Sequence, residues 1–470
     1  MSTSIQVKAL SVFAGKECLL GPVSFQVAPG GTLVIMGETG AGKSLIAQAI
    51  LGTLPAALRA EGDIYINGNR VDQLSQVERA KLWGRDIATL PQEPWRALDP
   101  LMRSFGQVQE AHRFVARRSP DEAHQATQSA FQTLSLTGAE QRLPGALSGG
   151  MAQRVAFAAA TAAKAPILLA DEPTKGLDAE RHSKVIDLLA EVPQAGGTLL
   201  AITHEATVAR RLGGVMLVLR EGTLVEQGPT AKVLNAPTDS YTQSLLDADP
   251  QNWPVSAPSS LGETVLTVNN LAVARGNRKL FQEFNLELRE GEKLALTGPS
   301  GIGKTTLLDA LAGLLKPQSG TVLRDPSLSR HGIQKLYQDP PAAFPDRISL
   351  SRTLKDVARL HRTDWNEVLH HLEQLGISPA LLNRRPDEVS GGELQRISIA
   401  RALTVKPKIL LADEPTSRLD PITQRETLAM LAGITAKTRI SIVLVTHDQN
   451  IAQKWADRTI SLVAAPASTE

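Results

Sequence analysis

The stretch GETGAGKS at residues 37–44 returns as GPSGIGKT at residues 298–305. Each copy places glycines before a lysine and a hydroxyl residue, the pattern of a loop whose backbone N–H groups surround phosphate oxygens. The helix expected after each loop directs its positive end towards the anion. The sequence therefore predicts two phosphate-binding loops in one chain. Their candidate binding residues are Gly37, Gly40, Gly42, Lys43 and Ser44 in the first copy and Gly298, Gly301, Gly303, Lys304 and Thr305 in the second.

The same further motifs follow both loops in the same order. A glutamine (Gln92 or Gln338) precedes a Ser-Gly-Gly segment, an apolar run that ends in Asp-Glu-Pro-Thr, and a Thr-His pair. The two lysines are 304 − 43 = 261 positions apart, whereas the two glutamines are 338 − 92 = 246 positions apart. The second copy is therefore shorter by 261 − 246 = 15 residues between lysine and glutamine. A repeat of this length indicates a domain duplication, because solenoid repeats are far shorter.

Alternating strand and helix patterns predict an α/β fold in each copy. Continuously apolar runs, typical of parallel strands buried on both faces, occur at residues 33–36, 167–170 and 199–202 and at 294–297, 409–412 and 442–445. Polar helical patterns at 121–136 and 366–375 predict an inserted helical subdomain in each copy. We expect one domain over residues 1–248 and another over 263–470, joined by an exposed linker at 249–262 that is rich in Pro, Ser and Ala.

Composition excludes several classes of protein. A net charge of +2 with 21% charged residues offers no basic footprint for nucleic acid. The single cysteine, Cys18, rules out an internal disulfide, and we expect it to be a small structural residue. The first ten residues lack the pattern of a signal peptide, and no apolar run approaches the ~20 residues of a membrane span. Any membrane role is therefore expected to depend on partners.

Two adjacent carboxylates follow a buried strand in each copy. Asp171 and Asp413 end these strands, where a carboxylate can bind the Mg²⁺ of a nucleotide. Glu172 and Glu414 come next, and the turn at the strand end can direct them to the water that attacks the γ-phosphate. Phosphoryl transfer requires mainly positioning and charge neutralisation, so a polarising carboxylate is sufficient.

With these motifs in place, the chain resembles the ATP-binding cassette (ABC) ATPases. LSGGM at 147–151 and VSGGE at 389–393 resemble the signature segment of that family, and Leu177-Asp178 and Leu419-Asp420 resemble its D-loop. His204 and His447 resemble its switch histidine. The resemblance covers about 90% of the chain and implies two P-loop domains. Each would have a mostly parallel sheet, an antiparallel β subdomain and an inserted helical subdomain.

The resemblance also implies two composite ATP sites, each formed by both domains arranged head to tail. ATP and Mg²⁺ are the implied ligands, and Ser44, Gln92, Asp171, Thr305, Gln338 and Asp413 are the implied metal-site residues. The implied catalytic residues are Glu172, His204, Glu414 and His447. The first site would join Lys43, Ser44, Gln92, Asp171, Glu172 and His204 to Ser390, Gly391 and Gly392; the second would join Lys304, Thr305, Gln338, Asp413, Glu414 and His447 to Ser148, Gly149 and Gly150.

The adenine contact differs between the copies. Family members stack the adenine on an aromatic residue before the phosphate loop, and Phe13, 43 − 13 = 30 residues before Lys43, fits that role or packs as an ordinary strand residue. Ala274 occupies the aligned position in the second copy, and its neighbour Arg275 is the alternative base contact. Adenine binding is therefore expected to be weaker at the second site.

Segments after the two glutamines and at the end of the first module resemble the peptide and nickel importer ATPases of the family. These segments are PQEPWRALDP at 91–100, its variant QDPPAAFP at 338–345, and EQGP, VLNAP and YTQSLL between residues 226 and 246. The resemblance implies two transmembrane permease subunits, an extracytoplasmic solute-binding protein and a position on the cytoplasmic face of the inner membrane. Permease contacts are expected near residues 93–109 and 339–354.

Two other functions remain open. A tandem ABC protein that acts on ribosomes or nucleic acid would carry a long charged linker, which differs from residues 249–262. An exporter ATPase would normally be fused to membrane spans. A nickel site at His361, His370 and His371 is a further alternative, but a polar helix is expected to turn these side chains to solvent.

Overall fold

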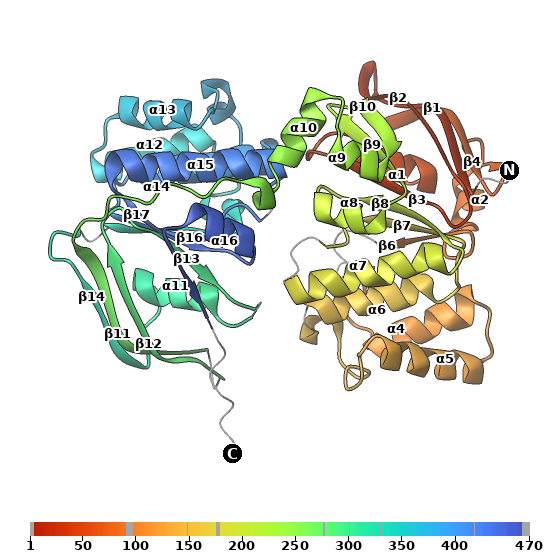
Figure 1. Cartoon of the computed structure of the whole chain (residues 1–470), viewed down its shortest axis with the longest axis horizontal. Coiled ribbons are helices and arrows are strands. Elements are labelled where there is room, and N and C mark those ends of the chain that lie inside the picture. The colour runs from red at the N-terminus through yellow and green to blue at the C-terminus, as the bar shows by residue number, and fades with distance from the viewer. Residues whose placement is uncertain are drawn as a thin grey trace. The chain divides into compact units, whose positions relative to one another are not determined.

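The computed structural model describes residues 4–90, 97–147, 149–174, 179–275, 278–299, 301–329, 331–417 and 419–462. The chain consists of two compact units, Met1–Asp249 and Pro250–Glu470. Each unit contains a parallel sheet, an antiparallel sheet and several helices (Figure 1). The two P-loop folds expected from the duplicated sequence are confirmed.

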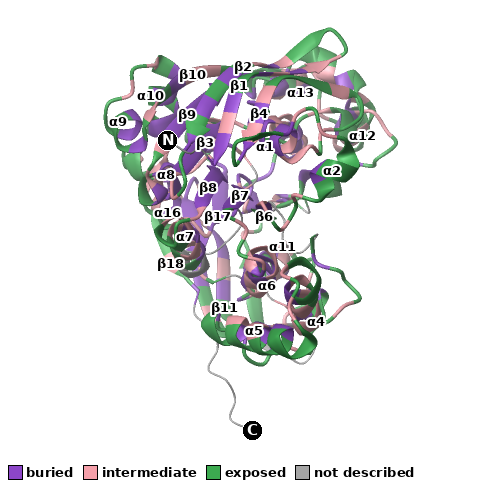
Figure 2. Cartoon of the chain, turned by 90° about the vertical axis from the view of Figure 1, so that its right-hand side faces the viewer, coloured by how far each residue is buried: buried purple, intermediate pink, exposed green. Residues whose placement is uncertain are grey.

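The central sheet of the first unit carries the site residues. Its strand order is β10-β9-β3-β8-β7-β6, and every adjacent pair is parallel except β10 and β9. The predicted buried strands are confirmed, because β3, β7 and β8 contain the apolar runs 33–36, 167–170 and 199–202 and lie in the interior (Figure 2). The strands are β3 (Thr32–Gly37), β6 (Ile87–Leu90), β7 (Ile167–Asp171), β8 (Thr198–Ile202), β9 (Val215–Arg220) and β10 (Thr223–Pro229).

The rest of the first unit forms an antiparallel sheet and helices. The sheet has the order β2-β1-β4-β5, with β1 (Ile5–Ala14), β2 (Glu17–Val27), β4 (Leu58–Ile66) and β5 (Asn69–Arg70). The inserted helical subdomain contains α4 (Ser104–Glu110), the π-helical turn η1 (Ala111–Val115), α5 (Pro120–Thr133) and α6 (Gly149–Thr161). The remaining helices are α1 (Lys43–Leu51), α2 (Gln76–Ala80), α7 (Ala179–Gln194), α8 (Ala206–Leu212), α9 (Thr230–Asn235) and α10 (Ser240–Asp247).

The second unit repeats this plan with fewer elements. Its parallel sheet has the order β15-β16-β17-β13-β18, and its antiparallel sheet has the order β12-β11-β14. The strands are β11 (Thr264–Arg275), β12 (Arg278–Arg289), β13 (Lys293–Thr297), β14 (Ser319–Arg324), β15 (Ile333–Leu336), β16 (Ile409–Asp413), β17 (Ser441–Val445) and β18 (Arg458–Ser461). The helices are α11 (Lys304–Ala312), α12 (Leu350–His361), α13 (Trp365–Gln374), α14 (Gly391–Leu403), α15 (Pro421–Thr438) and α16 (Gln449–Trp455).

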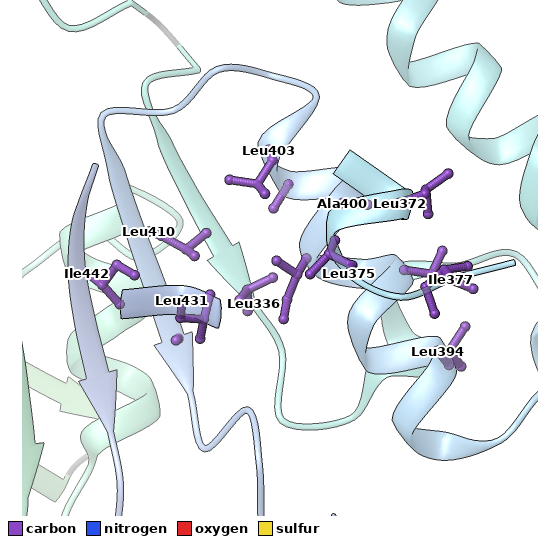
Figure 3. Close-up of a cluster of buried hydrophobic side chains, with 14 of the residues drawn as sticks. Leu336, Leu372, Leu375, Ile377, Leu394, Ala400, Leu403, Leu410, Leu431 and Ile442 are labelled. Carbon is purple, nitrogen blue, oxygen red and sulfur yellow. The ribbon is translucent and has the colours of Figure 1, made fainter. Parts of the chain in front are cut away.

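A hydrophobic cluster joins the helical subdomain of the second unit to its parallel sheet. Leu336 and Leu410 come from the sheet, and Leu372, Leu394 and Leu403 come from helices around them (Figure 3). All five side chains are buried. Removing each leucine from water contributes about 2 kcal/mol, so this cluster fixes α14, which carries the Ser-Gly-Gly segment, to the strand that ends in the Asp-Glu pair.

The 15-residue difference between the copies has a structural counterpart. In the first unit, β5 and α2 lie between β4 and β6, and α2 begins with a capping box of Ser75 and Glu78. In the second unit, β14 leads to β15 with no intervening helix or strand in the part that the structure describes. The described part of the second copy therefore has no counterpart of β5 and α2, but it keeps the strands that position the site.

The segment expected to be an exposed linker is attached to the second unit. Trp253 is only 8% exposed and belongs to the hydrophobic cluster of that unit. The backbone N–H of Ser256 donates to Lys454 O (2.7 Å), and that of Ser259 donates to Asp457 Oδ1 (2.8 Å). The composition of residues 249–262 suggested solvation, but one large aromatic side chain supplies enough apolar area to hold the segment on α16.

Replacing Trp253 with alanine is expected to destabilise the second unit by about 3 kcal/mol, because it leaves a cavity beside α16. The free energy of unfolding can be measured on the full chain by urea titration followed by far-UV circular dichroism. Val255→Ala, two residues away and 68% exposed in the wild type, is the matched control and should change stability by less than about 0.5 kcal/mol. Equal stabilities for the two variants would show that Trp253 does not anchor the segment.

Candidate functional site

The first phosphate loop connects β3 to α1. Gly37 has φ 153°, and a Cβ atom there would lie 2.3 Å from the carbonyl oxygen of Leu219, so only glycine fits. Lys43 is 6% exposed, and its Nζ donates to the carbonyl oxygens of Gly37 and Glu38, both at 2.7 Å. The ammonium group is thus held on the loop backbone, as a phosphate-binding lysine requires.

A hydroxyl and a carboxylate meet beside this loop. Ser44 Oγ donates to Asp171 Oδ2 at 3.1 Å, which brings the start of α1 to the end of β7. Both groups offer the oxygen ligands that Mg²⁺ takes from proteins, so the pair fits the expected magnesium site. Gln92, the third candidate of that site, lies outside the described residues, as do Ser148 and the D-loop residues Leu177 and Asp178.

Glu172 and His204 are brought together next to Asp171. The backbone of Glu172 has φ 45°, a left-handed value that is unusual for a glutamate, and its N–H donates to Ile202 O at 2.9 Å. Its side chain is 9% exposed, and Oε1 lies 3.3 Å from His204 Nδ1. Strained backbone of this kind concentrates at functional sites, and it directs the carboxylate away from the strand and towards the histidine.

The second unit assembles the same groups. Lys304 Nζ donates to the carbonyl oxygens of Gly298 (2.8 Å) and Pro299 (3.2 Å). Glu414 also has φ 45°, and its carboxylate accepts a hydrogen bond from Gln338 Nε2 at 3.1 Å. The lysine, glutamine and glutamate predicted for this site therefore lie together within one unit.

Neighbouring charges control the ionisation of Glu414. Burial opposes its ionisation, but the hydrogen bond and charge of His447, with the charge of Lys304, outweigh burial and hold the pKa of Glu414 below its ordinary value. Burial also opposes protonation of His447, yet Glu414, 3.6 Å from His447 Nδ1, raises the pKa of that imidazole. Glu414 is therefore an anion at neutral pH, as a water-polarising group must be.

Lys335 distinguishes the second unit and was not identified from the sequence. Its Nζ lies 2.7 Å from Asp309 Oδ1 and 3.5 Å from Asp413 Oδ2. Burial raises the pKa of Asp413, although the hydrogen bond from Thr305 and the Lys335 ammonium oppose that effect. The hydrogen bond between Thr305 and Asp413 matches the pairing of Ser44 and Asp171 in the first unit, and Lys335 adds a positive charge beside it.

The Ser-Gly-Gly segments lie at the starts of helices α6 and α14. Ser390 is the N-cap of α14 and forms a capping box with Glu393: its Oγ accepts from Glu393 N at 3.3 Å, and its N–H donates to Glu393 Oε2 at 2.8 Å. A Cβ atom on Gly149 or Gly391 would meet no heavy atom of the described residues within 4 Å. Packing therefore does not require glycine at these two positions.

The adenine contact remains a prediction. Phe13 is half-buried on β1, and the Arg59 guanidinium lies 5.2 Å from the centroid of its ring. Cys18 is its exposed cross-strand partner. Ala274 holds the aligned position on β11, and the side chain of Arg275 lies outside the described residues.

The three histidines of the second unit differ in their surroundings. His370 is exposed as expected, but His361 and His371 are half-buried, so the expectation that all three face solvent was wrong for these two. His361 packs edge to face against His331, with ring centroids 4.8 Å apart, because α12 ends beside the loop before β15. Within the described ranges, no group of three or more His, Cys, Asp or Glu side chains is arranged to hold a metal ion.

Glu205, which follows His204, lies beside the candidate site and was not identified from the sequence. Its carboxylate accepts from Thr174 Oγ1 at 2.6 Å and lies 2.5 Å from His182 Nε2. Burial opposes its ionisation, but the hydrogen bond and charge of His182 outweigh burial and lower the pKa of Glu205. An acidic residue directly after the histidine was the available signal, and Asp448 repeats it by capping α16.

Known proteins resemble the chain along nearly its whole length. The family model described as ABC transporter matches residues 20–175 and 281–417. The uncharacterized ABC transporter ATP-binding protein YejF of Escherichia coli K12 is 32% identical, over 94% of this chain and 90% of the relative. The peptidoglycan transport ATP-binding protein YejF of Agrobacterium fabrum is also 32% identical, over 93% of this chain and 86% of the relative.

A third relative is the glutathione import ATP-binding protein GsiA of Salmonella choleraesuis, 30% identical over 93% of this chain and 80% of the relative. Among solved structures, the archaeal ribosome recycling factor aABCE1 in its complex with the ribosomal stalk protein aP1 matches with a TM-score of 0.64. That match covers 92% of this chain and 83% of the other at 23% identity, so it supports the fold alone. The chain belongs to the ABC transporter family and is an ATPase built from two tandem ABC domains.

Proposed function

We propose that the chain is the ATP-hydrolysing subunit of an importer in which closure of the two ABC domains around ATP drives uptake of a small solute. The observation that supports this most directly is that each unit holds a phosphate-loop lysine, an Asp-Glu pair and a histidine in one cluster. Each cluster has both its lysine and its glutamate, so two competent sites are proposed.

Each proposed ATP site combines the phosphate loop of one domain with the Ser-Gly-Gly segment of the other. The N-terminal end of α14 or α6 would then present backbone N–H groups to the γ-phosphate bound in the opposite domain. The open surroundings of Gly149 and Gly391 suit such an approach. ATP would hold the two domains together, and hydrolysis would release them.

The proposed reaction is the attack of a water oxygen on the γ-phosphorus. The bond to the bridging oxygen breaks, and ADP and inorganic phosphate leave. Glu172 or Glu414 polarises the water, the adjacent histidine holds that carboxylate, and the loop lysine neutralises phosphate charge. Ser44 and Asp171, or Thr305 and Asp413, together with the loop glutamine would hold Mg²⁺, which would supply further charge neutralisation when bound.

Membrane subunits are the proposed partners, together with an extracytoplasmic solute-binding protein. No helix in the described part of the chain is long and apolar enough to cross a bilayer. Residues 93–109 and 339–354 are the proposed permease contacts, and Leu101, 87% exposed within the first of them, offers an apolar side chain for such a contact. The chain would lie on the cytoplasmic face of the inner membrane and would not bind nucleic acid.

A peptide-like solute is the proposed cargo. The names of two relatives refer to peptidoglycan transport and glutathione import, and both compounds contain peptide bonds. The sequence resemblance also includes nickel importers, so a nickel chelate is the competing cargo in the test.

Reconstitution tests this function. The chain would be assembled with its two membrane subunits in liposomes, and ATPase activity would be measured with binding protein loaded either with peptide or with a nickel chelate. Stimulation by the peptide-loaded protein is expected, and the Glu172→Gln/Glu414→Gln double variant is the inactive control. Stimulation only by the protein loaded with the nickel chelate would identify the chelate, and not a peptide, as the cargo. Co-purification with ribosomes in place of membrane subunits would overturn the importer assignment.

A further inference from the structure

The last helix of the first unit reaches its phosphate loop. The backbone N–H of Glu38, the second residue of the loop, donates to the hydroxyl oxygen of Tyr241 at 3.0 Å. Tyr241 lies on α10, 203 residues further along the chain, and is 6% exposed. No motif of the loop itself predicts this contact.

Several interactions position Tyr241. Glu226, 9% exposed, accepts hydrogen bonds from Thr238 N (2.8 Å), Thr238 Oγ1 (2.9 Å) and Asp239 N (3.2 Å). Asp239 in turn caps α10 and accepts from Tyr241 N at 2.8 Å. The guanidinium of Arg220 lies 5.2 Å from the centroid of the Tyr241 ring. The hydroxyl is therefore held at the loop by a connected polar network that begins on β10.

Tyr241 and Lys43 hold the same residue from its two sides. Tyr241 accepts the N–H of Glu38, while Lys43 Nζ donates to the carbonyl oxygen of Glu38 at 2.7 Å. The peptide groups on either side of Glu38 are thus both fixed. The orientation of these peptide groups determines where the loop presents its N–H groups and its lysine to phosphate oxygens.

The second unit cannot form this contact. Pro299 occupies the position of Glu38, and proline has no backbone N–H. The preceding glycines nevertheless have similar backbones, with φ 153° at Gly37 and φ 146° at Gly298. The first glycine of each loop therefore has a similar φ angle, but only the first loop offers a backbone N–H for a distant tyrosine to accept.

We propose that Tyr241 is a positioning residue of the first nucleotide site, whose hydroxyl fixes the Glu38 peptide and thereby the phosphate-binding geometry of the loop. The inference rests on the proposed role of this loop in ATP binding. It assigns to the C-terminal helix of the first unit a function in nucleotide affinity, and it makes the two sites unequal for a reason separate from the adenine contact.

Nucleotide titration of the full chain tests the proposal in a Lys304→Ala background, so that the first loop dominates binding of a fluorescent ATP analogue. Tyr241→Phe retains the ring over Arg220 and removes the hydroxyl. Its dissociation constant is expected to rise about three- to tenfold, the effect of one net hydrogen bond. Thermal melting should show little change, because the ring stays buried.

Glu38→Pro removes the N–H partner and copies the second loop, leaving Tyr241 in place. Relative to Glu38→Ala, which keeps the N–H, the Glu38→Pro variant is expected to show the same rise in dissociation constant as Tyr241→Phe. The double variant Tyr241→Phe/Glu38→Pro should have the same dissociation constant as either single variant. A purely structural role of Tyr241 would give additive effects, which would overturn the proposal.

Three results separate the possible failures. If the Lys304→Ala protein binds no nucleotide, the proposed function of the first loop fails. If it binds and Tyr241→Phe binds equally well, the positioning role fails while the site stands. If Tyr241→Phe unfolds, Glu38→Pro decides: affinity equal to that of Glu38→Ala overturns the proposal, and a three- to tenfold loss relative to it supports the proposal.

Discussion

Glu172→Gln and Glu414→Gln should each lower ATP turnover by about tenfold or more, and the double variant by about 10²–10⁴-fold. Glutamine keeps the size of the side chain but replaces one acceptor oxygen with an N–H₂ donor and loses the charge that polarises water in the proposed reaction. Each single substitution is expected to affect the whole reaction, because the proposed sites share both domains. Steady-state phosphate release from the full chain measures the effect.

Nucleotide affinity provides the control for these variants. The glutamates polarise water in the proposed reaction and do not hold phosphate, so the dissociation constant for ATP should change by less than about threefold. Loss of turnover with retained binding would place the defect in the chemical step. Unchanged turnover in either single variant would contradict the claim of two competent sites.

Gly391→Asp should reduce turnover by about 10²-fold, the loss expected when one stabilising donor of a reacting phosphate is disrupted. In the proposed composite site, the aspartate would face the γ-phosphate of the ATP bound to the first domain. At the N-terminal end of α14 an acidic residue is favourable to the helix dipole, and a Cβ atom there meets no described atom within 4 Å. Stability should therefore be retained while activity is lost.

Phosphate release and thermal melting, measured on the same preparations, separate these effects. The turnover of Gly391→Ala should fall between that of the wild type and that of Gly391→Asp. Gly433→Asp is the matched control, since Gly433 also lies on a helix, a Cβ atom there would likewise meet no described atom within 4 Å, and the position is distant in sequence from every motif. Wild-type turnover in Gly391→Asp would exclude α14 from the site.

Local sequence patterns determined much of the architecture. The six apolar runs form strands β3, β7, β8, β13, β16 and β17, because a strand buried on both faces has little tolerance for polar residues. Motif order was equally informative about which candidate site residues meet, since Lys304, Gln338 and Glu414 lie together. The composite arrangement of the two domains stays a prediction.

Features that depend on distant residues could not be predicted in this way. Residues 249–262 look like a solvated linker in sequence, because the burial of Trp253 depends on a hydrophobic cluster formed by later parts of the second unit. The contact between Glu38 and Tyr241 joins residues 203 positions apart, and a periodic pattern contains no information about such a pair. Lys335 was missed for the same reason, since its partner Asp309 lies on another element.

The left-handed backbone at Glu172 and Glu414 also bears on engineering. Such a conformation costs on the order of 1 kcal/mol for a residue with a side chain, and glycine would relieve it. Selection of variants for heat resistance alone would therefore favour glycine at the two positions where the proposed reaction needs the acid. Because Glu172 and Glu414 each combine a strained backbone with a proposed role in hydrolysis, a library selected for thermostability should be screened for turnover at every round.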